Sequence, residues 1–186
     1  MRRLFLAVDL SPDARQSLAR ALLWMGDYEG RVKIVPAENY HVTLKFLGAT
    51  DEARIPLIRS TLESAIQCHC ISELKINGWG VFPEAGHPKV FWAGVEPKGA
   101  FDPLFQQCET ALEPLNYPRE AIEFQSHVTL ARAGKSRVPA GFIERWRLMG
   151  PMPEPASFST RQITLYESVT HDQAPIYKPL AFIQLK

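Results

Sequence analysis

Two identical four-residue motifs stand out among the residues of this chain that could do chemistry. Residues 41–44 and residues 127–130 both read HVTL, so each motif places a histidine two residues before a threonine. The chain has five histidines, and a second chance copy of the same letters has a probability of roughly one in a thousand at residue frequencies of several per cent. The pair of motifs is therefore the strongest signal in the sequence.

The chemistry of such a pair follows from the geometry of a strand. Residues i and i+2 of a β-strand point to the same face, so each motif presents an imidazole beside a hydroxyl. An unperturbed imidazole has a pKa of about 6.5 and can serve as an acid or as a base at neutral pH. One histidine can then deprotonate a nucleophile, the other can protonate a leaving oxygen, and the hydroxyls can donate to anionic oxygens. This set of groups suits phosphoester transfer.

The surroundings of the motifs indicate a degenerate internal duplication. Each motif continues to a glycine at the same offset, Gly48 in the first copy and Gly134 in the second. The shift between the copies is 127 minus 41, or 86 residues, and it also lays residues 4–8 over residues 90–94, both largely apolar. Each of these segments leads into a helical pattern. We therefore expect two similar lobes, each of which supplies one histidine and one threonine.

The hydrophobic pattern predicts an α+β fold with two similar sheets, each backed by helices, and a groove in which the polar faces of the motif strands meet. Strands are expected at residues 4–8, 31–35, 40–47, 71–81, 89–95, in the second motif, and at residues 158–166 and 177–185. The apolar stripes of helices are expected within residues 14–25, 55–66, 101–115 and 137–149. A stiff, proline-rich linker is expected over residues 150–155. In the first motif strand, alternation places Lys45 on the polar face with His41.

The bulk composition limits the function classes. A chain of 186 residues with 46% apolar content suits one globular domain or two closely packed lobes. A net charge of +1 argues against a protein that coats duplex nucleic acid, although a small anion or a strand end is compatible with it. Three cysteines give no disulfide framework, and no segment is long enough for a signal peptide or a membrane span. A soluble cytoplasmic protein without membrane partners is expected.

Several alternatives compete with two-histidine chemistry. A metal site could use the same imidazoles, but neither motif carries an acid within four residues downstream, and metal phosphodiesterases gather carboxylates. The segment at residues 68–70 reads CHC but lacks a second cluster to complete a zinc site, and it equally suits the frayed end of a helix. A triad hydrolase would leave one motif idle, and the sequence has no Gly-x-Ser-x-Gly elbow. Half-buried polar pairs without function, a non-catalytic nucleotide-binding module and a structural adaptor also remain open.

The motifs and their flanks resemble those of the 2H phosphoesterases. The likeness rests on both HVTL motifs, on KFLG at residues 45–48, on Ala131 and Arg132 after the second motif, and on YES at residues 166–168. Within that superfamily the chain is most similar to the bacterial and archaeal RNA 2′,3′-cyclic phosphodiesterases, also described as 2′-5′ RNA ligases. The resemblance covers nearly the whole chain. It implies one bilobal domain over residues 1–186, with antiparallel sheets related by a pseudo-twofold axis and the active-site groove between the lobes.

The resemblance also implies a reaction. A terminal 2′,3′-cyclic phosphate of RNA is opened to a 2′-phosphate without a metal or another cofactor. His41 matches the position of the proton donor to the leaving 3′ oxygen, and His127 matches the acceptor that activates water. Thr43 and Thr129 match phosphate-binding positions. The implied substrates are RNA ends, including tRNA fragments, or small cyclic nucleotides, handled by a monomer; 2′-5′ ligation is the alternative outcome.

Two further site residues follow from the same resemblance. Arg132 matches a phosphate-contacting arginine, and Phe46, its counterpart under the 86-residue shift, is placed to stack on the terminal base. Simple alternation instead puts both on the core side of their strands, with Leu44 and Leu130. A β-bulge or a strand end would turn them into the groove.

Overall fold

The computed structural model describes residues 1–68, 70–134, 137–150, 156–170 and 175–186. The strands in these ranges are β1 (Arg2–Asp9), β2 (Val32–Ile34), β3 (His41–Thr50), β4 (Ile71–Phe82), β5 (Val90–Glu96), β6 (His127–Ala133), β7 (Ala156–Thr160), β8 (Gln162–Val169) and β9 (Ile176–Gln184). The α-helices are α1 (Pro12–Ala21), α2 (Ile55–Ala65), α3 (Asp102–Leu112) and α4 (Ala140–Arg147). Short 3₁₀ turns span Leu23–Tyr28, Ala37–Asn39, Glu52–Arg54 and Glu113–Leu115. The expected mixture of strands and helices is confirmed.

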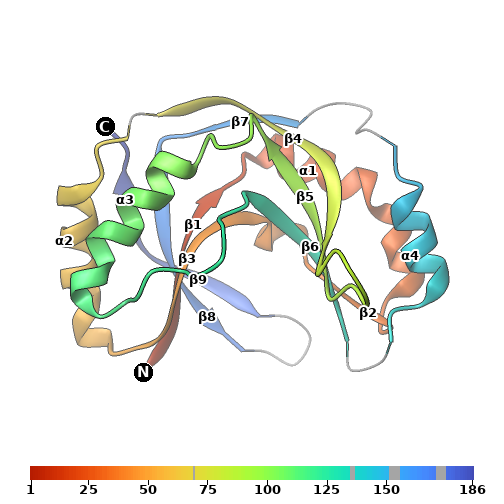
Figure 1. Ribbon diagram of the computed structural model, residues 1–186, viewed down its shortest axis with the longest axis horizontal. Coiled ribbons are helices and arrows are strands. Elements are labelled where there is room, and N and C mark those ends of the chain that lie inside the picture. Colours follow the sequence, from red (N-terminus) through yellow and green to blue (C-terminus); the bar gives the residue numbers. More distant parts are fainter. Residues whose placement is uncertain (69, 135–136, 151–155, 171–174) are drawn as a thin grey trace.

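The strands form one curled antiparallel sheet in the order β7-β4-β5-β6-β3-β1-β8-β9, and β2 pairs with β6 beside this path (Figure 1). Its two halves make up two lobes. We call β3, β1, β8 and β9 with α2 and α3 the first lobe, and β6, β5, β4, β7 and β2 with α1 and α4 the second lobe. The lobes join where Val42 of β3 pairs with Val128 of β6. The predicted fold class is confirmed, and the structure adds that the two sheets are continuous through the motif strands.

The helices cross between the lobes. Helix α1 follows β1 of the first lobe along the chain, yet it packs against β7 of the second lobe. Helix α3 follows β5 of the second lobe and packs against β3 and α2 of the first. Figure 1 shows the result, with α2 and α3 at one side of the molecule and α1 and α4 at the other. Each lobe is therefore covered by one helix from the first half of the sequence and one from the second.

Local sequence explains where the helices begin. Ser11 is the N-cap of α1, and its hydroxyl accepts from the Ala14 amide at 3.2 Å. Pro12 occupies the first turn, where its missing N–H costs no hydrogen bond. Asp51 caps the short turn before α2 in the same manner. The predicted stripes point inward, since Leu18 of α1 and Leu62 of α2 are fully buried.

Two expectations about the strands have different outcomes. The strands expected at residues 71–81 and 89–95 are confirmed as β4 and β5, which pair antiparallel around residues 83–89. The expected single strand over residues 158–166 is wrong: a bend at Arg161 divides it into β7 and β8. The Thr160 hydroxyl donates to the Gln162 carbonyl at 2.7 Å across this bend. Strand β7 then pairs with β4 in the second lobe, and β8 pairs with β1 in the first.

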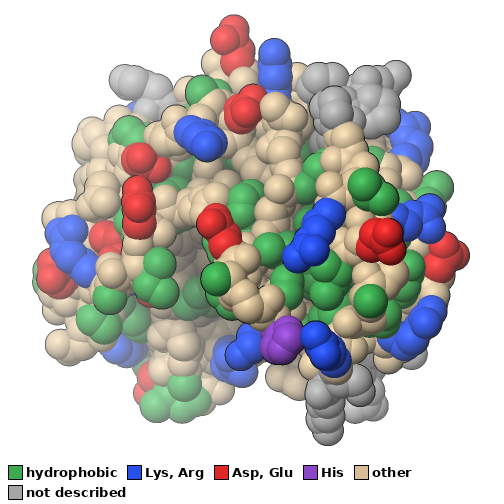
Figure 2. All heavy atoms as spheres, turned by 45° about the vertical axis from the view of Figure 1, so that its right-hand side comes forward, with side chains coloured by type: hydrophobic (Ala, Val, Ile, Leu, Met, Phe, Trp, Pro, Cys, Tyr) green, Lys and Arg blue, Asp and Glu red, His purple; other side chains and the backbone are tan. Residues whose placement is uncertain are grey.

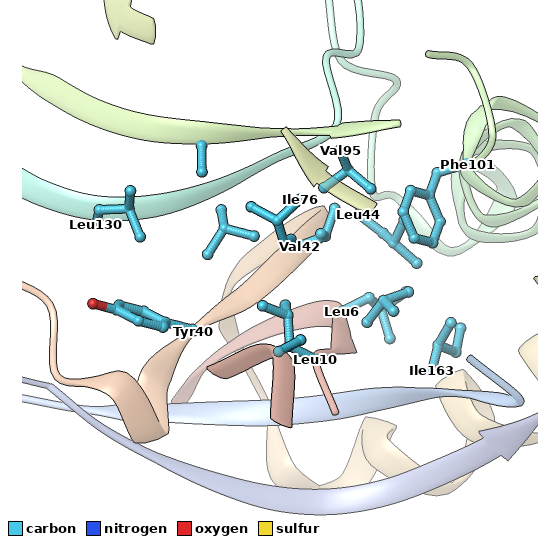
Figure 3. Close-up of a cluster of buried hydrophobic side chains, with 14 of the residues drawn as sticks. Leu6, Leu10, Tyr40, Val42, Leu44, Ile76, Val95, Phe101, Leu130 and Ile163 are labelled. Atoms are coloured by element: carbon cyan, nitrogen blue, oxygen red, sulfur yellow. The ribbon is translucent and has the colours of Figure 1, made fainter. Parts of the chain in front are cut away.

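One hydrophobic core runs beneath both motif strands. Figure 3 shows Val42 and Leu44 of β3 and Leu130 of β6 pointing into the same apolar cluster. These three side chains are at most 2% exposed. The core-facing positions of both motifs were predicted correctly, and their burial leaves the histidines and threonines on the opposite face of each strand.

The surface carries charges of both signs. In Figure 2, Lys and Arg side chains are interspersed with Asp, Glu and apolar side chains over the face shown, in keeping with the net charge of +1. Among the described residues, no helix has the length and apolar content needed to cross a membrane.

The centre of the CHC segment, His69, lies outside the described residues, as do residues 151–155 of the expected linker and His171. His87 is exposed in the turn between β4 and β5.

Candidate active site

The two motifs face one another where the lobes join. Strands β3 and β6 are antiparallel, and Val42 lies opposite Val128. One residue further in each direction, this register sets His41 across from Thr129 and Thr43 across from His127. The four motif side chains are half-buried on the groove face. The structure thus brings together the two histidines and two threonines that the sequence singled out.

Matching β-bulges turn Phe46 and Arg132 away from the core. In the β1–β3 pairing the register skips Leu44, and in the β5–β6 pairing it skips Leu130. Two consecutive residues are buried at each bulge, and the next residue is exposed. Phe46 is 62% exposed, and both Phe46 and Arg132 line the same cavity as the motifs. The bulge that was needed to reconcile alternation with the family pattern is present in both lobes.

The same bulge corrects the expectation for Lys45. Alternation placed this lysine on the polar face, but its side chain is buried and its Nζ lies 2.5 Å from Glu109 Oε1 of α3. The ammonium also donates to the Pro118 carbonyl at 2.7 Å. The other carboxylate oxygen of Glu109 accepts from the Glu120 amide at 2.7 Å. Because the charge is paired and hydrogen-bonded, Lys45 can occupy a core position that the second lobe fills with Ala131.

Each catalytic candidate is held by the same hydrogen bond. His41 Nδ1 lies 2.7 Å from the carbonyl of Asn39, and His127 Nδ1 lies 2.7 Å from the carbonyl of Gln125. A carbonyl can only accept, so each Nδ1 must carry the proton. When the rings are neutral, each Nε2 is therefore left with a free lone pair. His41 Nε2 lies 3.0 Å from the Thr43 hydroxyl, which can donate to it.

The aromatic surroundings of the two histidines differ. His41 contacts Phe5 and Tyr177, with ring centroids at 5.1 and 5.3 Å. His127 contacts Phe82 edge-on, with centroids at 5.1 Å, and lies 5.9 Å from Trp92. These rings remove water from both imidazoles.

Among the described residues, the strand pairing places a carboxylate beside His41 and none beside His127. Asp9 lies opposite His41 in the β1–β3 pairing, and the corresponding residue opposite His127 in the β5–β6 pairing is Gly94. A Cβ at Gly94 would lie 2.6 Å from the Asn77 carbonyl oxygen, so a side chain there would clash. The carboxylate of Asp9 accepts from Tyr166 at 2.7 Å, from Thr164 at 2.8 Å and from Arg15 at 3.1 Å.

Burial and nearby charges set the protonation of the two histidines. Burial lowers the pKa of His41 from 6.5 to about 4, with smaller lowering effects from Arg132 and His127. The hydrogen bond to Asn39 and the charge of Asp9 act in the opposite direction. Burial and Arg132 likewise lower the pKa of His127, against the hydrogen bond to Gln125. Both shifts favour the neutral form of the imidazoles at pH 7.

A cavity of about 190 Å³ opens over this face of the sheet. Its lining includes His41, Thr43, Thr129, Phe46 and Arg132 from the predicted set. His127 is not part of the lining, although the strand pairing sets it across from Thr43, which is.

The remaining lining residues and Asp9 were not singled out from the sequence as site residues. These lining residues are Gly48 of β3 and, from other strands and turns, Arg3, Leu4, Phe5, Val35, Asn39, Ser168 and Tyr177. One signal could have revealed Asp9: it is an acid that ends an otherwise apolar strand. Ser168 belongs to the YES segment that carried part of the family likeness.

The comparisons with known proteins agree with this geometry. Residues 7–172 match the model of the 2′-5′ RNA ligase superfamily. The RNA 2′,3′-cyclic phosphodiesterase of Archaeoglobus fulgidus is 32% identical, over 96% of this chain and 97% of that protein. The enzyme of the same name from Methanothermobacter thermautotrophicus is 28% identical, over 98% of each chain.

Solved structures show the same fold. The crystal structure of TT0787 of Thermus thermophilus superposes with a TM-score of 0.78 at 27% identity, over 98% of this chain and 97% of that one. Escherichia coli LigT complexed with 3′-AMP gives a TM-score of 0.76 at 22% identity, over 99% and 98% of the two chains. With a family match over most of its length and two histidine motifs at the junction of two such lobes, this chain belongs to the 2′-5′ RNA ligase superfamily.

Proposed function

We propose that this protein hydrolyses the 2′,3′-cyclic phosphodiester at the end of an RNA strand to a 2′-phosphomonoester. Its relatives named RNA 2′,3′-cyclic phosphodiesterase support this activity. The observation that carries the mechanism is the matched pair of 2.7 Å hydrogen bonds, which fix both Nδ1 protons and leave each Nε2 as the ring atom that can take or give a proton. One enzyme can therefore hold an acid and a base on opposite sides of a phosphate.

In the proposed reaction, His127 Nε2 takes a proton from a water molecule as the water oxygen attacks phosphorus. The bond between phosphorus and O3′ breaks, and His41 Nε2 gives its proton to the departing oxygen. The phosphate stays on O2′. Protons and charges balance, because one histidine gains the proton that the other loses, and the pair is reset by exchange with solvent. Each acid-base group is expected to contribute about 10²- to 10⁴-fold to the rate.

The acid role requires a protonated His41, and burial alone disfavours it. Burial lowers the pKa of His41 to about 4. A bound phosphodiester brings a negative charge beside both rings and raises both pKa values. Asp9 adds a second negative charge on the side of His41, and Gly94 adds none on the side of His127. This difference supports His41 as the proton donor and His127 as the acceptor.

The other cavity residues supply binding. Thr43 and Thr129 stand across from the opposite histidine and can donate to the non-bridging oxygens of the phosphate. Arg132 offers a guanidinium for charge-assisted hydrogen bonds to the same group. The exposed ring of Phe46 offers a face on which the terminal base can stack, with an expected contribution of about 1–3 kcal/mol.

The donor set supports a reaction that needs no metal or other cofactor. The polar side chains that line the cavity carry the imidazole of His41, hydroxyls, an amide and two guanidinium groups, and the nearby carboxylate of Asp9 already accepts from three donors. In the test, enzyme treated with a chelator and dialysed should open a 2′,3′-cyclic nucleotide end at an unchanged rate and yield the 2′-phosphate. Loss of activity that a divalent ion restores would overturn the metal-free mechanism. Accumulation of a 3′-phosphate would overturn the assignment of the leaving oxygen.

The same assay separates the alternative functions. A non-catalytic nucleotide-binding module would bind the cyclic phosphate without turnover, and a structural adaptor would do neither. Formation of 2′-5′ linkages from a cyclic phosphate end and a 5′-hydroxyl end would identify ligation by the reverse route. We propose that residues 1–186 form one bilobal domain that acts as a cytoplasmic monomer on RNA ends such as tRNA fragments. The three cysteines, which form no disulfide, support a reducing compartment.

A further inference from the structure

Lys33 lies directly opposite Arg132 in neighbouring strands. The β2–β6 pairing sets these two residues as cross-strand partners. Residues paired in this way have Cβ atoms roughly 5 Å apart on the same face of the sheet. Both side chains are exposed. Two positive charges therefore stand side by side at this point of the sheet.

This pair of cations adjoins the cavity of the active site. Arg132 lines the cavity, and so does Val35, whose amide donates to the Leu130 carbonyl of β6 at 2.9 Å. Lys33 precedes Val35 by two residues along an extended segment, so the two side chains share a face. The lysine is therefore on the groove side, one step further from the histidines than Val35.

The pair has no carboxylate partner within the part of the chain that the structure describes. Six other basic side chains in that part make ion pairs with carboxylates, and these are Arg2, Arg15, Lys45, Arg59, Arg119 and Arg145. Across the described residues, neither Lys33 nor Arg132 has such a partner. Like charges at directly opposed strand positions destabilise a sheet. An arrangement that costs stability in the protein alone is typical of a site that an anion completes.

We propose that Lys33 and Arg132 together bind the phosphodiester that precedes the terminal nucleotide, so that the preferred substrate is an RNA strand end and not a free cyclic mononucleotide. This inference rests on the proposed function. Arg132 stands three residues beyond Thr129 along β6, roughly 10 Å at about 3.3 Å per residue, and Lys33 lies beside it. A guanidinium can contact two phosphates at once, and an ammonium binds a phosphate as a point charge.

The location of Lys33 also predicts the direction in which the RNA strand lies across the groove. Strand β2 pairs with β6 of the second lobe. At the corresponding place in the first lobe, beyond the bulge in β3, stands the exposed Phe46. The terminal base is thus directed toward Phe46 of one lobe, and the preceding phosphodiester toward Lys33 of the other.

The test compares two substrates that differ by one phosphodiester. A dinucleotide that ends in a 2′,3′-cyclic phosphate carries the preceding phosphodiester, and a 2′,3′-cyclic mononucleotide with a 5′-hydroxyl does not. Wild-type enzyme should show the higher kcat/KM on the dinucleotide. Lys33→Gln should lower the ratio of the two kcat/KM values about three- to tenfold, the usual effect of losing one charged contact. Lys33→Arg, which keeps the charge, should retain the ratio.

A matched control and a second readout keep the result interpretable. Lys75→Gln removes another exposed strand lysine, on β4, and should leave the ratio unchanged. The second readout is the slope of log Kd against log salt concentration for binding of the unreactive dinucleotide 2′-phosphate. This slope should be smaller by about 0.7 in Lys33→Gln than in the wild-type enzyme. An unchanged ratio and an unchanged slope would overturn the inference. Failure of wild-type enzyme to hydrolyse either substrate would instead overturn the proposed function.

Discussion

The two lobes present their histidines with the same geometry and different electrostatics. Each imidazole is oriented by one backbone carbonyl at 2.7 Å and follows the same strand alternation. The strand beside His41 places Asp9 opposite it, whereas the strand beside His127 places Gly94 there. The proposed division into an acid and a base depends on such a difference, because two equivalent histidines would have no reason to take different roles. Pseudo-symmetry thus positions both imidazoles, while the residue opposite each one, Asp9 or Gly94, gives them different electrostatic surroundings.

A second difference follows immediately after the motifs. Both lobes have a bulge at the leucine of HVTL, but the buried residue that follows is Lys45 in one and Ala131 in the other. The exposed residue after that is Phe46 or Arg132. The shared backbone thus presents an exposed aromatic ring on one side of the groove and an exposed cation on the other.

The largest expected effect comes from breaking the pair of histidines. His41→Ala and His127→Ala should each lower kcat about 10²- to 10⁴-fold, because each removes one proton-transfer group. The double variant should lose much less than the product of the two, since the residues act as a unit. Single-turnover hydrolysis of a cyclic phosphate end measures all three values. If either single variant retained full activity, the two-histidine mechanism would have to be abandoned.

The second prediction concerns the ion pair of Lys45 and Glu109, which is buried in the first lobe, where the second lobe has Ala131. Lys45→Met should lower the free energy of unfolding by about 3 kcal/mol, because Glu109 is left buried without its cation. Adding Glu109→Gln should recover part of the loss. Urea unfolding provides the measurement, and Arg59→Met, which breaks an exposed pair with Glu63 on α2, is the control with an expected change below about 0.5 kcal/mol. If Lys45→Met and Arg59→Met lost equal free energies of unfolding, burial of the ion pair would not account for its contribution to stability.

The residues after the bulges should affect different kinetic constants. Arg132→Ala should lower kcat/KM about 10- to 100-fold with a fall in kcat, because a guanidinium contact to the phosphate strengthens as charge develops. Phe46→Ala should raise KM about three- to tenfold with little change in kcat, because base stacking is uniform binding.

Both side chains are exposed, so neither variant should lose more than about 0.5 kcal/mol of stability. Melting curves alongside the kinetics check this. A large drop in Tm for Arg132→Ala, with full activity in the remaining folded protein, would make Arg132 a structural residue.

The smallest expected effect tests whether the charge of Asp9 acts on His41 and not on His127. The negative charge of Asp9 raises the pKa of His41, so Asp9→Asn should lower that pKa and leave the pKa of His127 nearly unchanged. Since the donor must be protonated, the high-pH limb of kcat should move to lower pH by up to about one unit, and the rate at neutral pH should fall up to about tenfold.

Histidine NMR titrations and pH–rate profiles measure both quantities. Asp13→Asn, on the exposed first turn of α1, is the control. A shift of the low-pH limb in Asp9→Asn would assign the carboxylate to the base and would reverse the proposed roles.

The sequence predicted the motif strands and their buried faces, but not the bulges or the contacts that surround them. Repetition of HVTL identified the strands that meet, and alternation identified the buried faces of Val42 and Leu44. The bulges were needed to explain Phe46 and Arg132, but no glycine or proline marks them in the sequence. Their effect on Lys45 could not be foreseen, because its partner Glu109 is 64 residues away.

Contacts between distant segments account for the other differences. The position of Asp9 opposite His41 depends on the register of β1 against β3. The division of residues 158–166 into β7 and β8 depends on partners in separate lobes, β4 and β1. Both halves of that segment have strand-like alternation, and local pattern alone does not indicate that the chain changes lobes at Arg161.

The exchange of α1 and α3 between the lobes makes the molecule topologically inseparable. The two halves of the sequence look like repeats, yet a fragment that ended in the turn at residues 83–89 would leave the first lobe without α3, β8 and β9 and the second without β5, β6, β7 and α4. Neither fragment would contain a complete hydrophobic core. Circular permutation at that turn would preserve all elements, whereas division there would yield two chains that must recombine to fold.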